Sequence, residues 1–340
     1  MINSVSKSLE VVFFHRKPRA VGNYSIEFIF ADVRNRLGNM IRPRVVVSKY
    51  ESSGFINRFL NGIEARRSSG QVNHITGDVN YLGIFLSAEN TVNTILDCVH
   101  LNSSKGFKYW VFKKFWLEIP ERRARFLTAI SESTKREILR HHHCDPDKIR
   151  VIPVAISPAF QYKPKEFNED NPVILQIGTA PNKNIPLLIQ AVKGLKCVLN
   201  IVGKKDESYE ALLHENKIDY VYESNLTNEE ILERYERCDI VALVSTYEGF
   251  GMPILEAQAV GRVVITSNVY SMPEVAGDSA VLVDPSKVEE IRDGILRLIS
   301  DSEFRKDRIA SGLENIKRFN ADLIAHMYYD LYQEVAASNA

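Results

Sequence analysis

Short runs of apolar, often β-branched residues alternate along this chain with longer segments in which apolar residues recur at helical spacing. In the first half these runs predict strands at Leu9–His15, Arg44–Val47, Val72–His74, Val92–Asp97, Phe126–Ile130 and Ile149–Val154. Buried strands alternating with helices are typical of α/β units whose parallel sheets are covered on both faces. The first half is therefore expected to form one such unit.

The same pattern restarts after a break near the middle of the chain. Residues 157–172 are rich in proline and charge and lack periodicity, which is typical of a linker. Beyond them, apolar runs predict strands at Val173–Ile177, Cys197–Val202, Ile240–Val244, Val263–Ser267 and Ala280–Val283. We therefore expect two Rossmann-like domains, residues 1–157 and 158–320, with parallel sheets facing a central cleft. Apolar residues at helical spacing from Ala321 to Ala336 predict a terminal amphipathic helix.

Composition and charge narrow the class of protein. A chain of 340 residues with 45% hydrophobic content can bury two cores, which argues against disorder. Four cysteines without a CxxC pair fit reduced thiols in a cytoplasmic protein, and no run approaches the roughly 18 apolar residues of a membrane-spanning helix. Residues 1–157 carry 24 Lys and Arg against 14 Asp and Glu, whereas the remainder carries 19 against 29. The two halves are therefore expected to bind different partners.

The most informative segment runs from Ile240 to Ala259 and reads IVALVSTYEGFGMPILEAQA. An apolar strand ends there, two glycines let a ligand approach the backbone, and Pro253 stands where the first turn of a helix begins. Free amides at that helix start predict an anion site. Glu248 and Glu256 flank the turn, so both are expected to accept hydrogen bonds from the hydroxyls of one bound sugar or ribose.

A second segment of strand, glycine turn and helix start lies at residues 177–192, with Gly178 in the turn and Lys183 at the helix start. A diphosphate leaving group needs positive charge near its oxygens as the glycosidic bond breaks, and Lys183 with backbone amides would supply it. Each charge-assisted bond contributes on the order of 1.5–3 kcal/mol. We therefore expect neither a metal nor another cofactor. The alternative is an ordinary solvated lysine, because such turns are common in α/β proteins.

These segments carry a resemblance to a known family. Glu248-x7-Glu256 within YEGFGMPILEA closely resembles the EX7E signature of the retaining family 4 glycosyltransferases, which have the GT-B fold. Residues 263–285 resemble that family's closing stretch, and residues 129–135 resemble a segment of its N-terminal domain. The resemblance implies transfer from a UDP- or GDP-sugar to an acceptor in cell-surface polysaccharide or glycolipid synthesis. It also implies that residues 158–320 hold the donor, that residues 1–157 bind the acceptor, and that the helix within 321–340 packs back on them.

The resemblance also assigns roles to residues. Glu248 and Lys183 would be catalytic, with Glu248 near the donor sugar and Lys183 on the diphosphate. The donor would be bound by Gly178, Thr179, Asn182, Lys183, Lys204, Phe250, Gly251, Met252, Pro253 and Glu256. In such enzymes the leaving phosphate oxygen is thought to help deprotonate the acceptor on the same face, so no protein nucleophile is expected.

The chain departs from the family pattern in both halves. Thr179 and Ala180 follow Gly178 where the family often has an arginine, and Lys204 or Lys205 would replace it. The family's frequent histidine falls at Leu96, before Asp97. Candidate contacts to the acceptor or sugar are therefore Gly22, Asn23, His74, Asp97 and His100. These departures keep open a second interpretation, a catalytically silent sugar-nucleotide binding protein of the same fold.

Other signals are weaker. Residues 105–125 interleave cations with aromatics, which suits the inner face of a membrane or an anionic lipid-linked acceptor, or else a scaffold helix of the first domain. No nucleic acid is expected, because no binding module accompanies this patch. Asp145 and Asp147 match a DxD pattern but are interpreted as turn formers. Gly249-x-Gly251 is only a partial dinucleotide fingerprint, and it lies too late in its domain.

Overall fold

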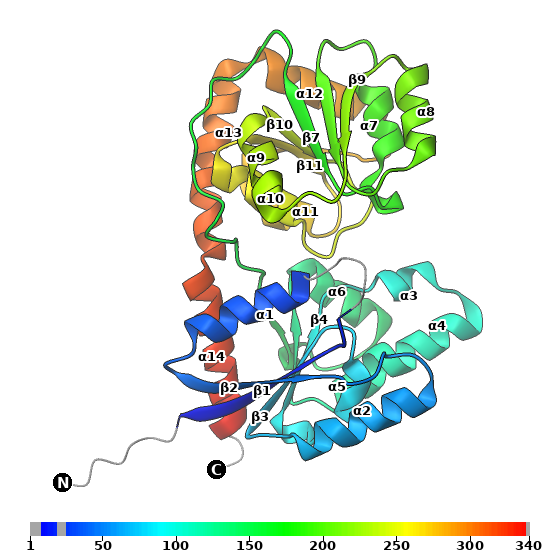
Figure 1. Ribbon diagram of the computed structural model, residues 1–340, viewed down its shortest axis with the longest axis vertical. Helices are drawn as coiled ribbons and strands as arrows, with labels where there is room; N and C mark the ends of the chain where they lie inside the picture. Colours follow the sequence, from blue (N-terminus) through cyan, green and yellow to red (C-terminus); the bar gives the residue numbers. More distant parts are fainter. Residues whose placement is uncertain (1–7, 19–24, 338–340) are drawn as a thin grey trace, which may run out of the picture. The chain divides into compact units, whose positions relative to one another are not determined.

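Two compact units make up the protein. The computed structural model describes residues 8–18 and 25–337 (Figure 1). Unit 1 comprises residues 1–155 and 321–340, and unit 2 comprises residues 156–320. The boundary between them lies two residues before the one expected from the sequence.

Unit 1 is built on a parallel sheet of six strands in the order β2-β1-β3-β4-β5-β6. The strands are β1 (Leu9–His15), β2 (Ile41–Val47), β3 (Val72–Thr76), β4 (Thr91–Ile95), β5 (Phe126–Ala129) and β6 (Ile149–Val151). All six were predicted, with ends shifted by up to three residues. Because β1 lies between β2 and β3, the strand order reverses there, and ligands of open α/β sheets bind at the carboxyl ends of such strands.

Helices and turns surround this sheet (Figure 1). They are α1 (Ser25–Arg36), α2 (Phe55–Arg67), η1 (Asn80–Ile84), η2 (Ala88–Asn90), α3 (Val99–Ser103), α4 (Gly106–Phe112), η3 (Lys113–Glu118), α5 (Ile119–Arg122), α6 (Glu132–His141), η4 (Pro146–Lys148) and α14 (Ala321–Ala337). The terminal helix α14 packs against α1 and the sheet. Its Tyr328 and Tyr332 are buried in one core with Phe13 and Phe30. The end of the chain therefore belongs to unit 1, as the resemblance implies.

Unit 2 has a parallel sheet in the order β12-β11-β10-β7-β8-β9. The strands are β7 (Val173–Ile177), β8 (Val198–Val202), β9 (Asp219–Glu223), β10 (Ile240–Leu243), β11 (Val263–Ser267) and β12 (Ala280–Val283). Here the order reverses between β7 and β10. The sequence missed β9 because this edge strand, DYVYE, is half exposed and has no apolar run.

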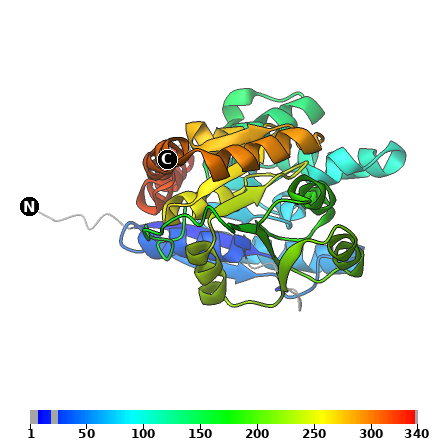
Figure 2. The ribbon, with the colours of Figure 1, turned by 90° about the horizontal axis from the view of Figure 1, so that it is seen from above.

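Two layers of helices enclose the sheet of unit 2, as Figure 2 shows. On one side α7 (Ile185–Val192) packs with α8 (Glu207–Glu215) and α12 (Val288–Ser300). The other group is α9 (Asn228–Arg237), α10 (Met252–Val260), α11 (Met272–Ala276) and α13 (Ser302–Asn315). The shorter turns are η5 (Pro181–Lys183), η6 (Gly277–Ser279) and η7 (Ile316–Phe319).

The segment interpreted as a linker has no regular structure, but it is fixed to unit 2. Lys165 pairs with Asp239, which is 4% exposed. The same carboxylate accepts hydrogen bonds from the amides of Asn168 and Val173 (3.0 and 2.8 Å). The Arg305 guanidinium also lies over a ring of this segment. Proline and charge therefore indicated the lack of regular structure correctly, and the segment packs on unit 2.

Candidate active site

Two loops of unit 2 meet at the point where its strand order reverses. One follows β7 and leads into α7, and the other follows β10 and leads into α10. The amide of Thr246 donates to the carbonyl of Asn182 (2.8 Å), and the side-chain amide of Asn184 donates to the carbonyl of Val244 (3.1 Å). Because β7 and β10 are neighbouring parallel strands, the loops leave the same edge of the sheet. The two segments that the sequence singled out therefore form one site.

Gly178 makes the first turn possible. Its φ of +86° lies in the left-handed region that favours glycine. A Cβ at this position would stand 2.9 Å from Cε of Lys183, closer than real contacts allow. The glycine therefore lets the lysine side chain fold back over the turn.

Lys183 and Glu248 form an ion pair between the two loops. The lysine Nζ lies 2.6 Å from Oε1 of Glu248, and the two side chains are 16% and 14% exposed. The same oxygen accepts a hydrogen bond from Ser245 Oγ (2.7 Å). Because both charges are partly removed from water, they attract more strongly than a surface pair. Both residues predicted to be catalytic are thus in direct contact.

The start of α10 presents backbone amides. Gly251 precedes the helix with φ +107°, and no side chain caps this terminus. Ser271 Oγ lies within hydrogen-bonding distance of the carbonyls of Glu248 and Phe250 (2.9 and 2.8 Å), which fixes the loop. Amides in the first turn of a helix have no partner within the helix, so they attract anions.

Glu256 lies on α10 near this turn. Its Oε2 accepts a hydrogen bond from the hydroxyl of Tyr235 on α9 (2.5 Å). Burial raises the pKa of Glu256, while that hydrogen bond and the charge of Lys183 act in the opposite direction. The carboxylate is thus fixed within the electrostatic reach of Lys183. No sequence pattern pointed to Tyr235, because the residue lies on another helix.

The remaining donor candidates are distributed around the two loops. Asn182 Nδ2 donates to the carbonyl of Tyr247 (2.8 Å) and so belongs to the loop contact. Thr179 Oγ1 donates to the carbonyl of Lys204 (2.8 Å), whereas the Lys204 side chain is exposed. Pro253 occupies the first turn of α10 and is buried. The structure therefore brings Asn182, Lys183 and Glu248 together and leaves Lys204 on the surface.

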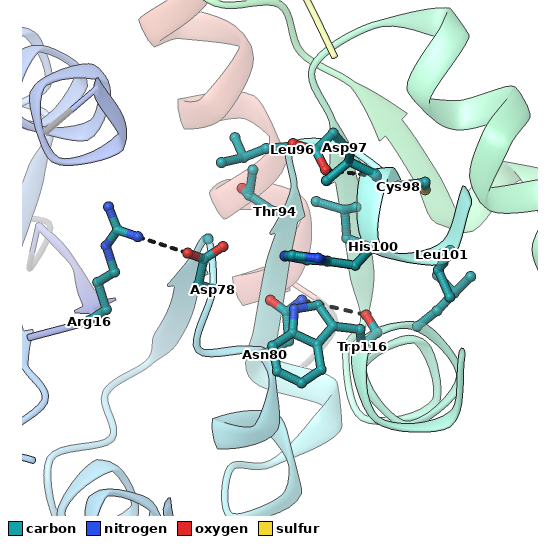
Figure 3. Close-up of a pocket in the computed structure, with 14 residues that line it drawn as sticks. Arg16, Asp78, Asn80, Thr94, Leu96, Asp97, Cys98, His100, Leu101 and Trp116 are labelled. Atoms are coloured by element: carbon teal, nitrogen blue, oxygen red, sulfur yellow. Dashed lines mark hydrogen bonds and ion pairs between the residues drawn. The ribbon is translucent and has the colours of Figure 1, made fainter. Parts of the chain in front are cut away.

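Unit 1 has a pocket of its own, with a volume of about 290 Å³ (Figure 3). It is lined by residues that follow β1, β3 and β4, at the reversal of strand order in this unit. Asp97 and His100, two of the predicted contacts, line it, as does Leu96 at the position of the family's usual histidine. The sequence did not single out Arg16 or Asp78, although each follows the end of a predicted strand.

His74 was wrongly predicted as a sugar contact. It is fully buried, with Nδ1 2.7 Å from the hydroxyl of Tyr332 and Nε2 2.7 Å from Oγ1 of Thr94. Burial lowers its pKa to about 3, so the ring is neutral. His74 therefore joins α14 to the sheet. Gly22 and Asn23 lie outside the described residues.

The aromatic and cationic segment is partly packed into unit 1 and partly exposed. Tyr109, Phe112 and Leu117 pack into a core of unit 1, as a scaffold helix would. Phe107 and Trp110 are 78% and 51% exposed, as a surface-binding helix would have them. The structure thus assigns part of the segment to the scaffold and leaves an aromatic surface on α4.

Some features bear on metals and membranes. Asp145 Oδ1 accepts from the amide of Asp147 (2.9 Å), as a turn former does. In the described ranges, no group of three or more His, Cys, Asp or Glu side chains is placed to hold a metal ion. No helix of residues 8–18 and 25–337 has both the length and the apolar character needed to cross a bilayer.

Comparison with known proteins gives one family match and several relatives. Residues 159–314, nearly all of unit 2, match the family model described as glycosyl transferases group 1. The O-antigen chain mannosyltransferase B of Escherichia coli is 30% identical over 58% of this chain, and the chain spans just over half of that relative's length.

Solved structures extend the likeness to both units. A glycosyltransferase from Rickettsia africae is similar with a TM-score of 0.76 and 17% identity, over 96% of this chain and 98% of that one. The HepE protein of Anabaena, crystallised with UDP and glucose, has a TM-score of 0.76 and 13% identity, over 96% and 100% of the two chains. The α/β fold class with two Rossmann-like units of the GT-B type is thereby confirmed.

Proposed function

We propose that this chain is a retaining glycosyltransferase of the EX7E type, family 4, which transfers a sugar from a UDP- or GDP-sugar to an acceptor in cell-surface polysaccharide or glycolipid synthesis. The observation that carries the proposal is the contact between Lys183 and Glu248, with Glu256 within electrostatic reach, where the strand order of unit 2 reverses. The group 1 match covers this unit, and the mannosyltransferase relative supports a hexosyl donor.

The donor would bind through its diphosphate. A phosphate oxygen would take the place of Glu248 as partner of the Lys183 ammonium, while the amides at the start of α10 bind a second oxygen. Glu256, fixed by Tyr235, would accept a hydrogen bond from a ribose hydroxyl. Glu248, released from the lysine, would then accept from a hydroxyl of the donor sugar. The UDP bound in the HepE crystal supports a nucleoside diphosphate.

The chemistry follows from these contacts. The bond between C1 of the sugar and the phosphate oxygen breaks, and the acceptor oxygen bonds to C1 on the same face. This same-face substitution retains the configuration at C1, and the acceptor's proton moves to the departing phosphate oxygen. Lys183 and the helix amides stabilise the negative charge that develops on the phosphate. This site therefore needs no metal ion for the transfer.

Glu248→Ala tests the proposal. We expect transfer and slow donor hydrolysis to fall at least about 100-fold. Thermal shift with a panel of UDP-, GDP- and ADP-sugars identifies the donor, because ligand binding raises the melting temperature. Unchanged turnover in the variant would contradict the assigned role. A donor that binds to the natural chain but is never hydrolysed would favour a silent binding protein.

We also propose that α4 contacts the inner face of a membrane. Phe107 and Trp110 are exposed beside Lys105, Lys108 and Lys114, and the Lys114 ammonium lies 5.0 Å from the Trp110 ring centroid. Such a surface binds anionic headgroups and the acyl boundary. Flotation with liposomes containing anionic lipid should recover the protein at low salt, and recovery equal to that with neutral liposomes would contradict the idea.

A further inference from the structure

Tyr270 has an unusual backbone conformation beside the candidate active site. In the described part of the chain, the residues other than glycine with a positive φ are Asn184, Lys217, Asn225 and Tyr270. Asparagine tolerates this left-handed conformation, and Lys217 lies just past the end of α8, where such residues commonly terminate helices. Tyr270, with φ +54°, lies in the loop between β11 and α11 and has neither explanation. A left-handed bulky residue is uncommon and points to a function of its side chain.

The loop that carries Tyr270 is fixed to the loop that carries Glu248. It leaves β11, the parallel neighbour of β10, so both loops start at the same edge of the sheet. Ser267 Oγ donates to the carbonyl of Ser245 (2.7 Å), and Ser271 Oγ lies 2.9 Å from the carbonyl of Glu248. Tyr270 lies between these two serines in the sequence, so its backbone is held beside the candidate active site.

The side chain of Tyr270 adds an aromatic surface to this edge of the sheet. Its ring lies edge-on to that of Tyr247, with 4.6 Å between the ring centroids and 67° between the planes. Tyr247 directly precedes Glu248, the residue proposed to contact the donor sugar. Tyr270 is 37% exposed, so part of its ring is accessible while the Tyr247 ring supports it. A carboxylate that accepts from hydroxyls and an aromatic ring that packs on C–H groups together suit a sugar.

We propose that Tyr270, supported by Tyr247, binds the transferred sugar by packing its ring against the C–H face of a hexopyranose. The inference rests on the proposed function, because it takes Glu248 as the residue that binds the donor sugar. Glu248 accepts from a hydroxyl of that sugar, and Tyr270 covers its apolar carbons. The diphosphate is bound elsewhere, by Lys183 and the amides of α10. Tyr270 therefore adds affinity for the sugar and none for the nucleotide.

The test compares a nucleotide sugar with its nucleotide alone. Thermal shift first selects the donor that stabilises the natural chain most from UDP-glucose, UDP-N-acetylglucosamine, GDP-mannose and ADP-glucose. Calorimetric titration then gives dissociation constants for this donor and its nucleoside diphosphate. In Tyr270→Gly and Tyr270→Ala the donor should bind at least fivefold more weakly, while the nucleoside diphosphate binds within twofold of the natural chain. Tyr270→Phe keeps the ring and should retain the natural ratio of the two constants.

Glycine and alanine at this position separate binding from stability. Both remove the ring, but glycine adopts φ +54° without strain and alanine does not. Tyr270→Gly should therefore melt at a higher temperature than Tyr270→Ala, although both weaken donor binding equally. A merely structural role would instead make donor binding follow the melting temperature. Lys217→Gly is the matched control, because Lys217 has the same φ and is exposed at the end of α8, so both dissociation constants should stay unchanged.

Three results would overturn the inference: a natural ratio of dissociation constants in Tyr270→Gly, an equal loss of donor and nucleoside diphosphate binding, or a loss in Tyr270→Phe as large as that in Tyr270→Ala. Circular dichroism checks that each variant is folded. If neither the nucleotides nor their sugars bind to the natural chain, the proposed function itself is refuted. Binding of both with an unchanged sugar contribution in the variants would refute the role of Tyr270 alone.

Discussion

The two units place polar side chains at the same topological position, the reversal of strand order, but they assemble these side chains in different ways. In unit 2, two loops of consecutive residues bring a cation, a paired carboxylate and helix amides together. In unit 1, single residues from three strand ends, including Arg16, Asp78 and Asp97, line one pocket. The site of unit 2 is therefore recognisable in two short segments of the sequence, whereas the pocket of unit 1 forms only when the sheet brings distant residues together. Topology thus decides where polar side chains gather, whereas their spacing along the chain decides which of them the sequence reveals.

The largest effect is expected from removing the cation of unit 2. Lys183→Ala deletes the partner of Glu248 and the charge that would stabilise the departing diphosphate. Transfer should fall about 100- to 1,000-fold, as when one preorganised donor is removed from a catalytic site. Lys193→Ala is the matched control, because that exposed side chain follows the other end of α7 and should change transfer less than threefold. Initial rates at saturating donor measure both.

An equal loss of transfer in the Lys183 variant and in its control would contradict a local role for Lys183. In that case the positive charge of unit 2 would act as a diffuse field around both loops. The contact between Lys183 and Glu248 would then be a structural ion pair only.

Acidification should lower the stability of unit 1 more than that of unit 2. His15 and His74 are buried in unit 1, and burial lowers their pKa values from about 6.5 to about 4 and about 3. Both are neutral when folded and bind protons more readily when unfolded. Their contribution is therefore present above pH 6.5 and lost as the pH falls towards 4 and then 3. Between pH 6.5 and 5.5 the pair should lower the free energy of unfolding by roughly 2 kcal/mol.

Hydrogen exchange resolved by segment measures this. Amides of β1 and β3 should lose protection on acidification before those of β7 and β10. The single histidine among residues 156–320 is His214, which is exposed. Unit 2 therefore has no buried histidine whose protonation would favour unfolding. Simultaneous loss of protection in both units would show that the buried histidines do not determine the pH at which unit 1 unfolds.

The same comparison explains what the sequence could predict. Eleven of the twelve strands were found, because buried parallel strands are apolar runs, and the half-exposed edge strand β9 was missed. In unit 2, Lys183 and Glu248 each lie in one short segment with a glycine turn, so local chemistry identified them. In unit 1, Arg16 and Asp78 are 62 positions apart, and only the order of the sheet brings them together.

His74 also shows what local sequence patterns cannot predict. A histidine within a strand looks alike in a sequence whether it faces a pocket or a core. Its two ring nitrogens are bonded to Tyr332, 258 positions away, and to Thr94 on the neighbouring strand. Partners at such separations cannot be predicted from local spacing.

The smallest effect should come from Gly178→Ala, and it tests whether the turn positions Lys183 or merely connects two elements. Gly178 and Gly194 both have positive φ, +86° and +71°, so alanine strains each by roughly 1–2 kcal/mol. A Cβ at 178 would also stand 2.9 Å from Cε of Lys183, whereas nothing lies within 4 Å of one at 194. Thermal melts should therefore show similar losses of stability in the two variants.

Transfer should fall about tenfold in Gly178→Ala alone, because displacing a catalytic group lowers the rate. Equal activities at matched stability would mean that the lysine side chain adapts, and that the amides of α10 hold the diphosphate without it.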